Sequence, residues 1–243
     1  MTILSTTISP PDNGNHLLGA FPAPLLELVR RDMRTVTLAQ GRILYEVGAA
    51  VDTVYFPQTG LISLLIVTES GGMFEAATVG REGAVGLHAV LGRRFSFTRA
   101  TIQIGGLFIA VPVSRFAQHA AEHRAAHDVI SRYTEVLWAE AQQTTACNAA
   151  HDAASRLCRW LLQSSDRIGS DDVPLTQEFL AQMLGVRRTT VTLLAQTMQN
   201  RGLITYRRGN IRILNRAQLA QCACECYQAM RRPNLLASIG LTL

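Results

Sequence analysis

The chain has 243 residues, 48% of them hydrophobic, and a formal net charge of +5. This length and apolar content allow a sizeable core and fit two domains. No apolar run approaches the roughly 20 residues of a membrane helix, and the first residues do not resemble a signal peptide. Five cysteines, an odd number, argue against a disulfide framework. We therefore expect a cytoplasmic protein that does not act at a membrane.

The positive charge is concentrated in the last part of the chain. Residues 1–150 contain 11 arginines and 12 acids, a net charge of −1, whereas residues 151–243 contain 12 arginines and 6 acids, a net charge of +6. The span from Phe179 to Cys224 has seven arginines and no acid. A basic segment of this kind indicates a nucleic-acid backbone as partner, although a solvated basic face is the alternative.

The first half of the chain predicts a β-domain. After a polar segment at residues 1–18, the stretch from Pro24 to Met33 predicts a short amphipathic helix. From Thr35 to Pro112, β-rich runs alternate with glycine turns roughly every eight to twelve residues. This spacing predicts a compact all-β roll or barrel.

A long helix is expected next. The stretch from Ser114 to Asn148 lacks glycine and proline, and Ser114 is expected to cap a first short helix. In the longer helix that follows, one stripe recurs every three or four residues, which favours pairing with the same helix of a second chain. Packing on the chain's own β-domain is the alternative. The expected dimer interface consists of Ile130, Tyr133, Leu137, Ala141 and Thr144.

A helix-turn-helix is predicted between Thr176 and Leu203. Thr176 is a plausible N-cap, and Gly185 can adopt the left-handed conformation that ends the first helix. Apolar residues recur at helical spacing on both sides of this glycine. The pattern is typical of two short helices that cross closely.

Other signals surround this motif. Asp152 is positioned to cap the preceding helix, so residues 149–151 form a candidate hinge. After the motif, two short β-rich runs flank Arg208-Gly209-Asn210 and predict a two-stranded wing. Asn215 is expected to cap a last helix that ends near Arg232.

Basic and hydroxyl side chains crowd the start of the second helix, the end of a recognition helix that points into the major groove. Arginine can bind guanine O6 and N7, and threonine can offer a hydroxyl or a methyl group. An ordinary helical hairpin with a solvated basic end is the alternative. The expected DNA-binding residues, with two arginines of the wing, are Thr176, Arg187, Arg188, Thr189, Thr190, Thr192, Leu193, Arg207 and Arg208.

The order of these elements, together with Ser155-Arg156-Leu157 and Gly185-Val186-Arg187-Arg188-Thr189-Thr190-Val191, resembles the Crp/Fnr superfamily of bacterial transcription regulators over roughly residues 20–220. The resemblance implies that Thr176 contacts phosphate and that Arg188, Thr189 and Leu193 face the base edges. The best-known members carry an acid and a second arginine where this chain has Thr189 and Leu193. The half-site sequence should therefore differ from theirs.

The same resemblance implies an effector site in the β-domain. The ribose-binding acid of cyclic-nucleotide binders would fall on Val85, and Phe95 follows Arg94 in place of a hydroxyl residue. These departures disfavour a cyclic nucleotide and favour another small effector or no ligand. The candidate effector-binding residues are Glu82, Arg93, Arg94 and Arg99.

Two other clusters are more simply explained without a cofactor. His119, His123 and His127 recur every four residues, but a helix break in this region would separate them. Cys222, Cys224 and Cys226 are expected on one helix, which would turn Cys224 away from the other two. We interpret Cys147 and Cys158 as packing residues, and we expect no metal.

The fold class predicted is α+β, with a β-roll effector-sensing domain at residues 1–113, a dimerisation helix and hinge at 114–150, and a winged helix-turn-helix at 151–243. No catalytic motif indicates an enzyme. We expect a homodimeric, sequence-specific regulator with double-stranded DNA as partner, and RNA polymerase as a further partner if it activates transcription. The alternative is a ligand-, metal- or redox-sensing dimer that acts through a protein partner.

Overall fold

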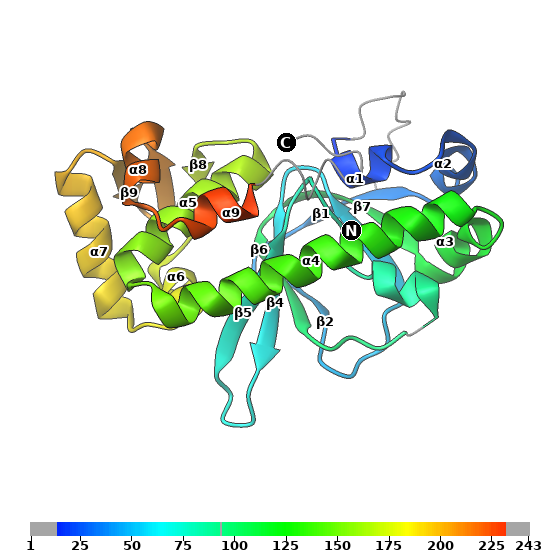
Figure 1. The fold of residues 1–243 in the computed structure, drawn as a ribbon, viewed down its shortest axis with the longest axis horizontal. Coiled ribbons are helices and arrows are strands. Elements are labelled where there is room, and N and C mark those ends of the chain that lie inside the picture. Colours follow the sequence, from blue (N-terminus) through cyan, green and yellow to red (C-terminus); the bar gives the residue numbers. More distant parts are fainter. Residues whose placement is uncertain (1–13, 93, 232–243) are drawn as a thin grey trace.

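A computed structural model describes residues 14–92 and 94–231 of the chain. It contains a β-roll, a long helix and a C-terminal winged helix-turn-helix, which confirms the predicted α+β fold class (Figure 1). Arg93, most of the polar segment at residues 1–18 and the expected helix end near Arg232 lie outside the described residues. Within the described part, no helix combines the length and apolar character of a membrane span.

The β-roll consists of two antiparallel sheets with strand orders β1-β7-β3 and β2-β6-β4-β5. One apolar core takes residues from both sheets, including Phe108 of β7 and Ile102 of β6. The strands are β1 (Arg34–Leu38), β2 (Ile43–Tyr45), β3 (Thr53–Pro57), β4 (Leu61–Val67), β5 (Met73–Val79), β6 (Arg99–Ile104) and β7 (Gly106–Pro112). They confirm the β-rich segment predicted from Thr35 to Pro112.

Three short helices accompany the sheets: α1 (His16–Gly19), α2 (Ala23–Arg30) and the 3-10 helix η1 (Leu87–Leu91). Helix α2 confirms the short helix predicted from Pro24, although it ends three residues before Met33. Its Leu25 and Val29 are buried in the core of the roll. Helices α2 and η1 both pack against α3.

Helices α3 (Val113–Ala120) and α4 (Arg124–Ala150) follow the roll. Ser114 lies inside α3, whose N-cap is Pro112, so the predicted cap at Ser114 is wrong. The chain breaks between the two helices, which separates His119 from His127 as expected. His119 instead lies 3.2 Å from a carboxylate oxygen of Asp32.

The predicted dimer stripe of α4 faces the chain's own β-roll. Ile130 and Tyr133 are buried in its core, and the Tyr133 hydroxyl accepts from the Ala84 N–H and donates to the Ala84 carbonyl, both at 3.0 Å. Thr144 is buried as well, and Leu137 and Ala141 are half-buried. The burial of Ile130 and Tyr133 favours the alternative, packing on the chain's own β-domain, and the assignment of the stripe to a dimer interface stays a prediction.

The C-terminal domain contains α5 (Ala153–Ile168), β8 (Asp172–Val173), α6 (Gln177–Leu184), α7 (Arg188–Asn200), β9 (Ile204–Arg207), β10 (Asn210–Ile213), α8 (Arg216–Cys222) and α9 (Cys226–Met230). The side chains of Asp152 and Asn215 cap α5 and α8, as predicted. Strand β8 adds a third strand to the wing within a loop that the sequence did not mark as β.

The last helix predicted from the sequence is two helices. Ala223 has an extended backbone (φ −76°, ψ 150°), which ends α8, and α9 begins at Cys226. Cys222 and Cys226 therefore do not share a helix face, and Cys224 is buried between the two helices. The prediction of one continuous helix through the three cysteines is wrong.

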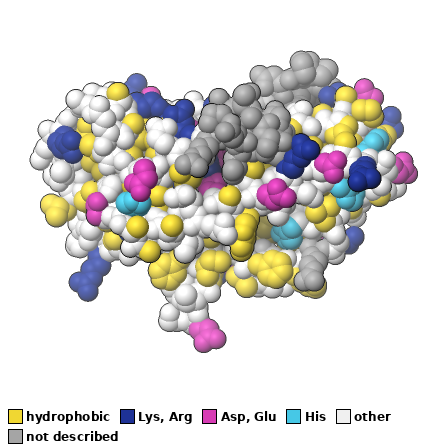
Figure 2. Space-filling model, viewed as in Figure 1, with side chains coloured by type: hydrophobic (Ala, Val, Ile, Leu, Met, Phe, Trp, Pro, Cys, Tyr) yellow, Lys and Arg dark blue, Asp and Glu magenta, His cyan; other side chains and the backbone are white. Residues whose placement is uncertain are grey.

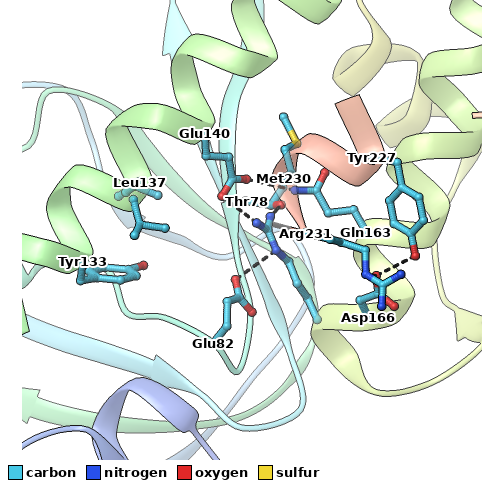
Figure 3. A pocket seen from close by; sticks show the side chains of 12 residues that line it. Thr78, Glu82, Tyr133, Leu137, Glu140, Gln163, Asp166, Tyr227, Met230 and Arg231 are labelled. Carbon is cyan, nitrogen blue, oxygen red and sulfur yellow. Dashed lines mark hydrogen bonds and ion pairs between the residues drawn. The ribbon is translucent and has the colours of Figure 1, made fainter. Parts of the chain in front are cut away.

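The buried Arg167 joins the β-roll, α4 and the C-terminal domain. Its partners Thr78, Glu82 and Glu140 are labelled in Figure 3. Arg167 of α5 pairs with Glu82 of the roll at 3.0 Å and with Glu140 of α4 at 2.7 Å, and it also donates to the Thr78 hydroxyl. Burial alone lowers the pKa of Arg167, but the two carboxylates together raise it above its ordinary value. Burial raises the pKa of Glu82, and the positive charge of Arg167 offsets part of this rise.

A second polar contact fixes the same junction. The indole N–H of Trp160 on α5 donates to Glu75 of β5 at 2.8 Å, and the Ser63 hydroxyl of β4 donates to the other oxygen of this carboxylate at 2.7 Å. Leu61 and Leu65 of β4 belong to the same apolar cluster as the core of the C-terminal domain. The two domains therefore share a hydrophobic interface at which both carboxylate oxygens of Glu75 are hydrogen-bonded.

We expect Arg167→Met to lower the free energy of unfolding by about 3–5 kcal/mol at neutral pH, because it leaves two buried carboxylates without their cation. Burial already raises the pKa of Glu82, and loss of the arginine should raise it further, so protonation of this carboxyl should relieve part of the deficit before the pH falls to its ordinary value of 4.5. Urea unfolding at neutral pH and near pH 4.5 measures the change in the free energy of unfolding.

Arg115→Met is the matched control, because Arg115 is 57% exposed and pairs with Asp32 at 3.6 Å on the surface. It should change stability by less than about 1 kcal/mol at either pH. Equal losses in the two variants would contradict the role assigned to Arg167.

Candidate nucleic-acid interface

The turn between α6 and α7 has the geometry that the sequence predicted. The Thr176 hydroxyl accepts a hydrogen bond from the Phe179 N–H at 3.3 Å and caps α6. Gly185 ends this helix with φ +63°, and the Val186 N–H donates to the Ala181 carbonyl at 3.0 Å. The left-handed residue and this backward hydrogen bond reverse the chain within one helical turn.

The buried face of α7 fixes the rotation of the helix. Val191, Ala195 and Met198 recur at helical spacing and pack into the core of the domain. The opposite face is therefore turned to solvent. Most of the predicted base-reading side chains lie on it: Arg187, Arg188, Thr189, Thr192 and Leu193 are exposed, and Thr190 is half-buried.

Leu193 is 68% exposed, although it is a large apolar side chain. Its helical neighbours on the same face, Thr189 and Thr192, are polar and exposed too. Packing in a hydrophobic core therefore does not explain a leucine at this position. Its methyl groups are available to an apolar group such as the thymine methyl.

Gln177 is a residue of this surface that the sequence analysis missed. Its side-chain oxygen accepts from the Arg188 Nε at 3.4 Å and from the Thr192 hydroxyl at 3.1 Å. The first residue of α6 thus orients two side chains of α7. Its position directly after Thr176, the residue that caps α6, is the sequence signal that could have identified it.

The wing carries the second basic segment. Arg208 and Gly209 both have positive φ, +49° and +78°, and form the tight turn between β9 and β10. Asn210, which was expected in the turn, begins β10 and pairs with Arg207. Two left-handed residues are the geometry of a type I′ hairpin turn, and Gly209 adopts it without steric cost.

Wing and helices enclose a surface hollow of about 380 Å³. Its lining brings together Thr176 and Gln177 of the α6 start, Arg188 of α7, and residues of the wing that include Tyr206 and Arg208. Arg207 is exposed but does not line it. Two guanidinium groups, a phenol and a hydroxyl around one hollow suit an anionic oxygen.

The candidate effector residues are not brought together. Glu82 pairs with Arg167, Arg99 pairs with Glu46 at 2.8 Å, and the Arg94 side chain is exposed. None of these three lines the large cavity of about 360 Å³ between the roll and α4. These three residues therefore lie in separate places in this structure, and the assignment of the set to an effector site stays a prediction.

The cavity itself is apolar. Its walls include Leu64 and Val85 of the roll and Tyr133, Leu137 and Trp138 of α4. No arginine, aspartate or glutamate is among the residues that line it. It suits an uncharged, apolar or aromatic molecule better than a phosphate.

The outer side of α4 carries a large exposed side chain that the predicted stripe did not include. Trp138 is 66% exposed and Phe97 of the roll is 71% exposed, both at the mouth of the cavity. Figure 2 shows hydrophobic side chains gathered below α4, beside the protruding β4–β5 hairpin. Contiguous apolar surface of this kind marks an interaction site.

Comparison with known proteins agrees with this geometry. Residues 155–222 match the family model described as a Crp-like helix-turn-helix domain. The span contains α6, α7 and the wing. In a comparison with curated proteins, no sequence matched significantly. Residues 155–222 thus form a Crp-like helix-turn-helix domain.

Solved structures extend the likeness to the whole fold. FixK2 from Bradyrhizobium japonicum is 16% identical with a TM-score of 0.68, over 79% of this chain and 98% of its own. A putative crp/fnr regulator from Eubacterium rectale is 14% identical with a TM-score of 0.66, over 87% and 99%. The c-di-GMP responsive regulator CLP of Xanthomonas campestris is 14% identical with a TM-score of 0.62, over 80% and 100%.

Thr176→Ala should lower the free energy of unfolding by about 1 kcal/mol, because the first turn of α6 loses its side-chain cap. Thr176→Ser keeps a hydroxyl acceptor and should cost only a small part of this. Thermal unfolding of both variants measures the difference. Equal stability of Thr176→Ala and the unsubstituted protein would contradict the capping role.

Proposed function

We propose that this protein is a regulator of the Crp/Fnr superfamily that binds double-stranded DNA sequence-specifically through α7 and regulates transcription as a homodimer. The observation that carries the proposal is the outer face of α7, which exposes Arg188, Thr189 and Leu193 while Val191 and Met198 fix its orientation. In this proposal residues 1–113 sense an effector, residues 114–150 form the dimerisation helix and hinge, and residues 151–243 bind DNA.

Two groups of residues would have different roles in binding the duplex. Arg188, Thr189 and Leu193 would reach base edges in the major groove, where an arginine selects guanine and a leucine favours a thymine methyl. Side chains at the edge of the helix and in the wing would bind phosphates and set the register. This positioning group is Thr176, Arg187, Thr190, Thr192, Arg207 and Arg208.

The dimer would form on the exposed side of α4 rather than on the predicted stripe. Thr134, Trp138, Ala141 and Thr145 recur every three or four residues along this side, and Ala141 is the one residue shared with the predicted set. Trp138 would be the central buried contact, since large aromatic side chains dominate interfaces. A two-fold axis here would place two copies of α7 on half-sites of a near-palindrome, about 34 Å apart.

A small effector in the apolar cavity would act on this dimer. The cavity is lined by Leu137 and Trp138 of α4, so a ligand there would contact the proposed dimer helix directly. Control of DNA binding would require that the ligand bind one dimer state more tightly than the other. An activator would in addition contact RNA polymerase. The competing function, a sensor that acts through a protein partner, predicts no salt-dependent binding to duplex DNA.

Arg188→Ala should weaken binding to the preferred site by about 1–3 kcal/mol and relax specificity at one position, because it removes a base contact. Arg207→Ala is the matched comparison, an arginine of the wing that would contact phosphate. It should weaken all sequences alike and reduce the salt slope by about 1.

Selection of bound fragments from random duplexes, followed by titration over a salt series, measures both effects. Uniform weakening by Arg188→Ala would contradict its role as a base reader. If the unsubstituted protein binds no duplex in a salt-dependent manner, the DNA-binding proposal itself is wrong.

Trp138→Glu should shift the protein from dimer to monomer, because it places a charge at the centre of the proposed α4 seam. Leu107→Glu is the control, since Leu107 is also a partly exposed apolar residue, 41% exposed, but lies on β7 of the roll. Sedimentation equilibrium distinguishes the two species. A Trp138→Glu variant that stays dimeric would exclude this face of α4 as the seam.

A further inference from the structure

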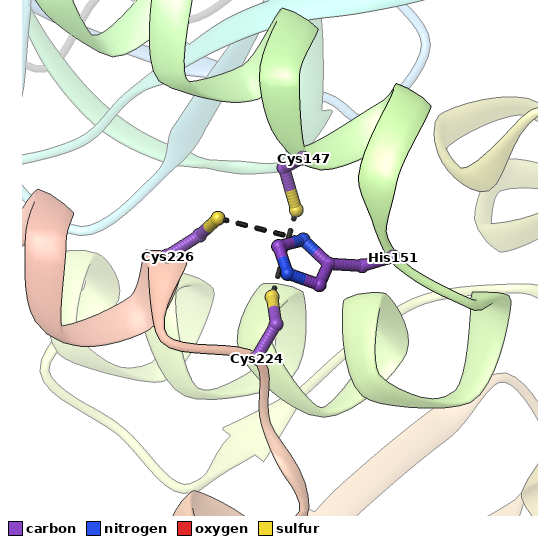
Figure 4. A group of neighbouring side chains, drawn as sticks. All are labelled: Cys147, His151, Cys224 and Cys226. Carbon is purple, nitrogen blue, oxygen red and sulfur yellow. Dashed lines mark hydrogen bonds between the residues drawn. The ribbon is translucent and has the colours of Figure 1, made fainter.

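Four potential metal ligands converge where α4 ends and the C-terminal helices meet (Figure 4). They are Cys147, His151, Cys224 and Cys226, and their sulfur and nitrogen atoms all lie within 4.8 Å of one another. The three cysteines are buried and the histidine is half-buried. The cluster joins residues that are more than 70 positions apart in the sequence.

The backbone brings the ligands together in two pairs. Cys147 and His151 are four residues apart, so they lie on one face at the end of α4, where the His151 N–H donates to the Cys147 carbonyl at 3.1 Å. Cys224 lies in the interruption between α8 and α9, and Cys226 is the first residue of α9. In one continuous helix Cys224 and Cys226 would point in different directions, so the interruption allows both thiols to reach the cluster.

The distances between the ligand atoms suit one tetrahedral ion. The Sγ atoms of Cys147 and Cys224 are 3.5 Å apart, and the Cys226 Sγ lies 3.7 Å from the His151 Nδ1. A tetrahedron with metal–sulfur bonds of about 2.3 Å and a metal–nitrogen bond of about 2.0 Å has edges of roughly 3.5–3.8 Å. An iron–sulfur cluster would spread the sulfurs over several irons and hence farther apart.

The remaining contacts orient the ligands. The His151 Nε2 lies 3.1 Å from a carboxylate oxygen of Glu225, which favours a proton on Nε2 and leaves the Nδ1 lone pair directed at the cysteines. A carboxylate behind a ligating histidine is the usual partner of such a site. The Gln143 amide donates to the Cys226 Sγ at 3.1 Å.

The charge around the cluster also suits a metal thiolate. Three thiolates and one divalent cation carry a net charge of −1, and the buried Arg159 interacts electrostatically with Cys147 and Cys224. The Arg159 Nε has no hydrogen-bond partner among the described residues, although it is buried. Simple packing explains three buried thiols but not the convergence of an imidazole, a carboxylate and a guanidinium on them.

We propose that Cys147, His151, Cys224 and Cys226 bind one zinc ion, which fastens the end of α4 to the C-terminal helices beside the hinge. Cys3His is a closed ligand set that is typical of structural zinc rather than catalytic zinc. The ion would hold α9 against α4 and so restrict movement at residues 151 and 152, between α4 and α5. This site is independent of whether α7 reads DNA.

Metal analysis of the full-length protein, purified under reducing conditions without chelator, tests the proposal. We expect about one zinc ion per chain, and on replacement by Co²⁺ we expect the sulfur-to-cobalt charge-transfer band and the intense visible bands of tetrahedral coordination. These spectra use the unsubstituted protein and do not depend on the folding of any variant. No stoichiometric zinc and no such cobalt spectrum would overturn the proposal, as would iron with acid-labile sulfide.

Cysteine substitutions assign the ligands. Cys147→Ser and Cys226→Ser should lose the ion or weaken its binding strongly, whereas Cys158→Ser and Cys222→Ser should retain it, since neither thiol belongs to the cluster. Glu225→Gln, which changes only the outer carboxylate, should weaken zinc binding by about 10–100-fold. Retention of zinc in Cys147→Ser and Cys226→Ser, or equal loss in the two controls, would contradict the assigned ligands.

Discussion

The buried cation of Arg167 is the constraint on which the arrangement of the two domains depends. A guanidinium removed from water is unfavourable unless acids compensate it, and here the acids come from different parts of the fold, Glu82 from the roll and Glu140 from α4. If the C-terminal domain moved away from the roll, Arg167 would move with it and leave both carboxylates without their cation. The ion pairs therefore specify one docking geometry, while the apolar cluster that includes Leu61 also joins the two domains.

The placement of α7 follows from the anchoring of α5 at both ends. Arg167 fixes the last turn, and near the first turn the Arg156 guanidinium donates to Asn148 of α4 and to the Leu184 carbonyl of α6, each at 2.7 Å. Arg156 thus connects the end of the long helix to the helix that precedes the turn. The orientation of the outer face of α7 relative to α4 is consequently set by two buried arginines rather than by the turn alone.

The sequence predicted the parts of the fold that depend on near neighbours. The caps at Asp152, Thr176 and Asn215 and the left-handed Gly185 are local, because each is decided within a few residues. The surface that covers the α4 stripe could not be predicted, since apolar periodicity shows that a helix has a buried face but not which surface buries it. The break at Ala223 was missed for a related reason: its extended backbone places Cys224 against Cys147, 77 residues earlier.

Helix α4 connects the sites that the proposals assign to ligand, partner and metal. Tyr133 and Leu137 face the cavity, Trp138 faces outward, Glu140 meets Arg167, and Cys147 ends the helix at the thiol cluster. In one continuous helix these side chains cannot move independently by more than small rotations. A ligand in the cavity would thus change the hinge only by shifting the balance between two positions of α4. A zinc ion at its end would oppose that shift, because it fastens α4 to the domain that carries α7.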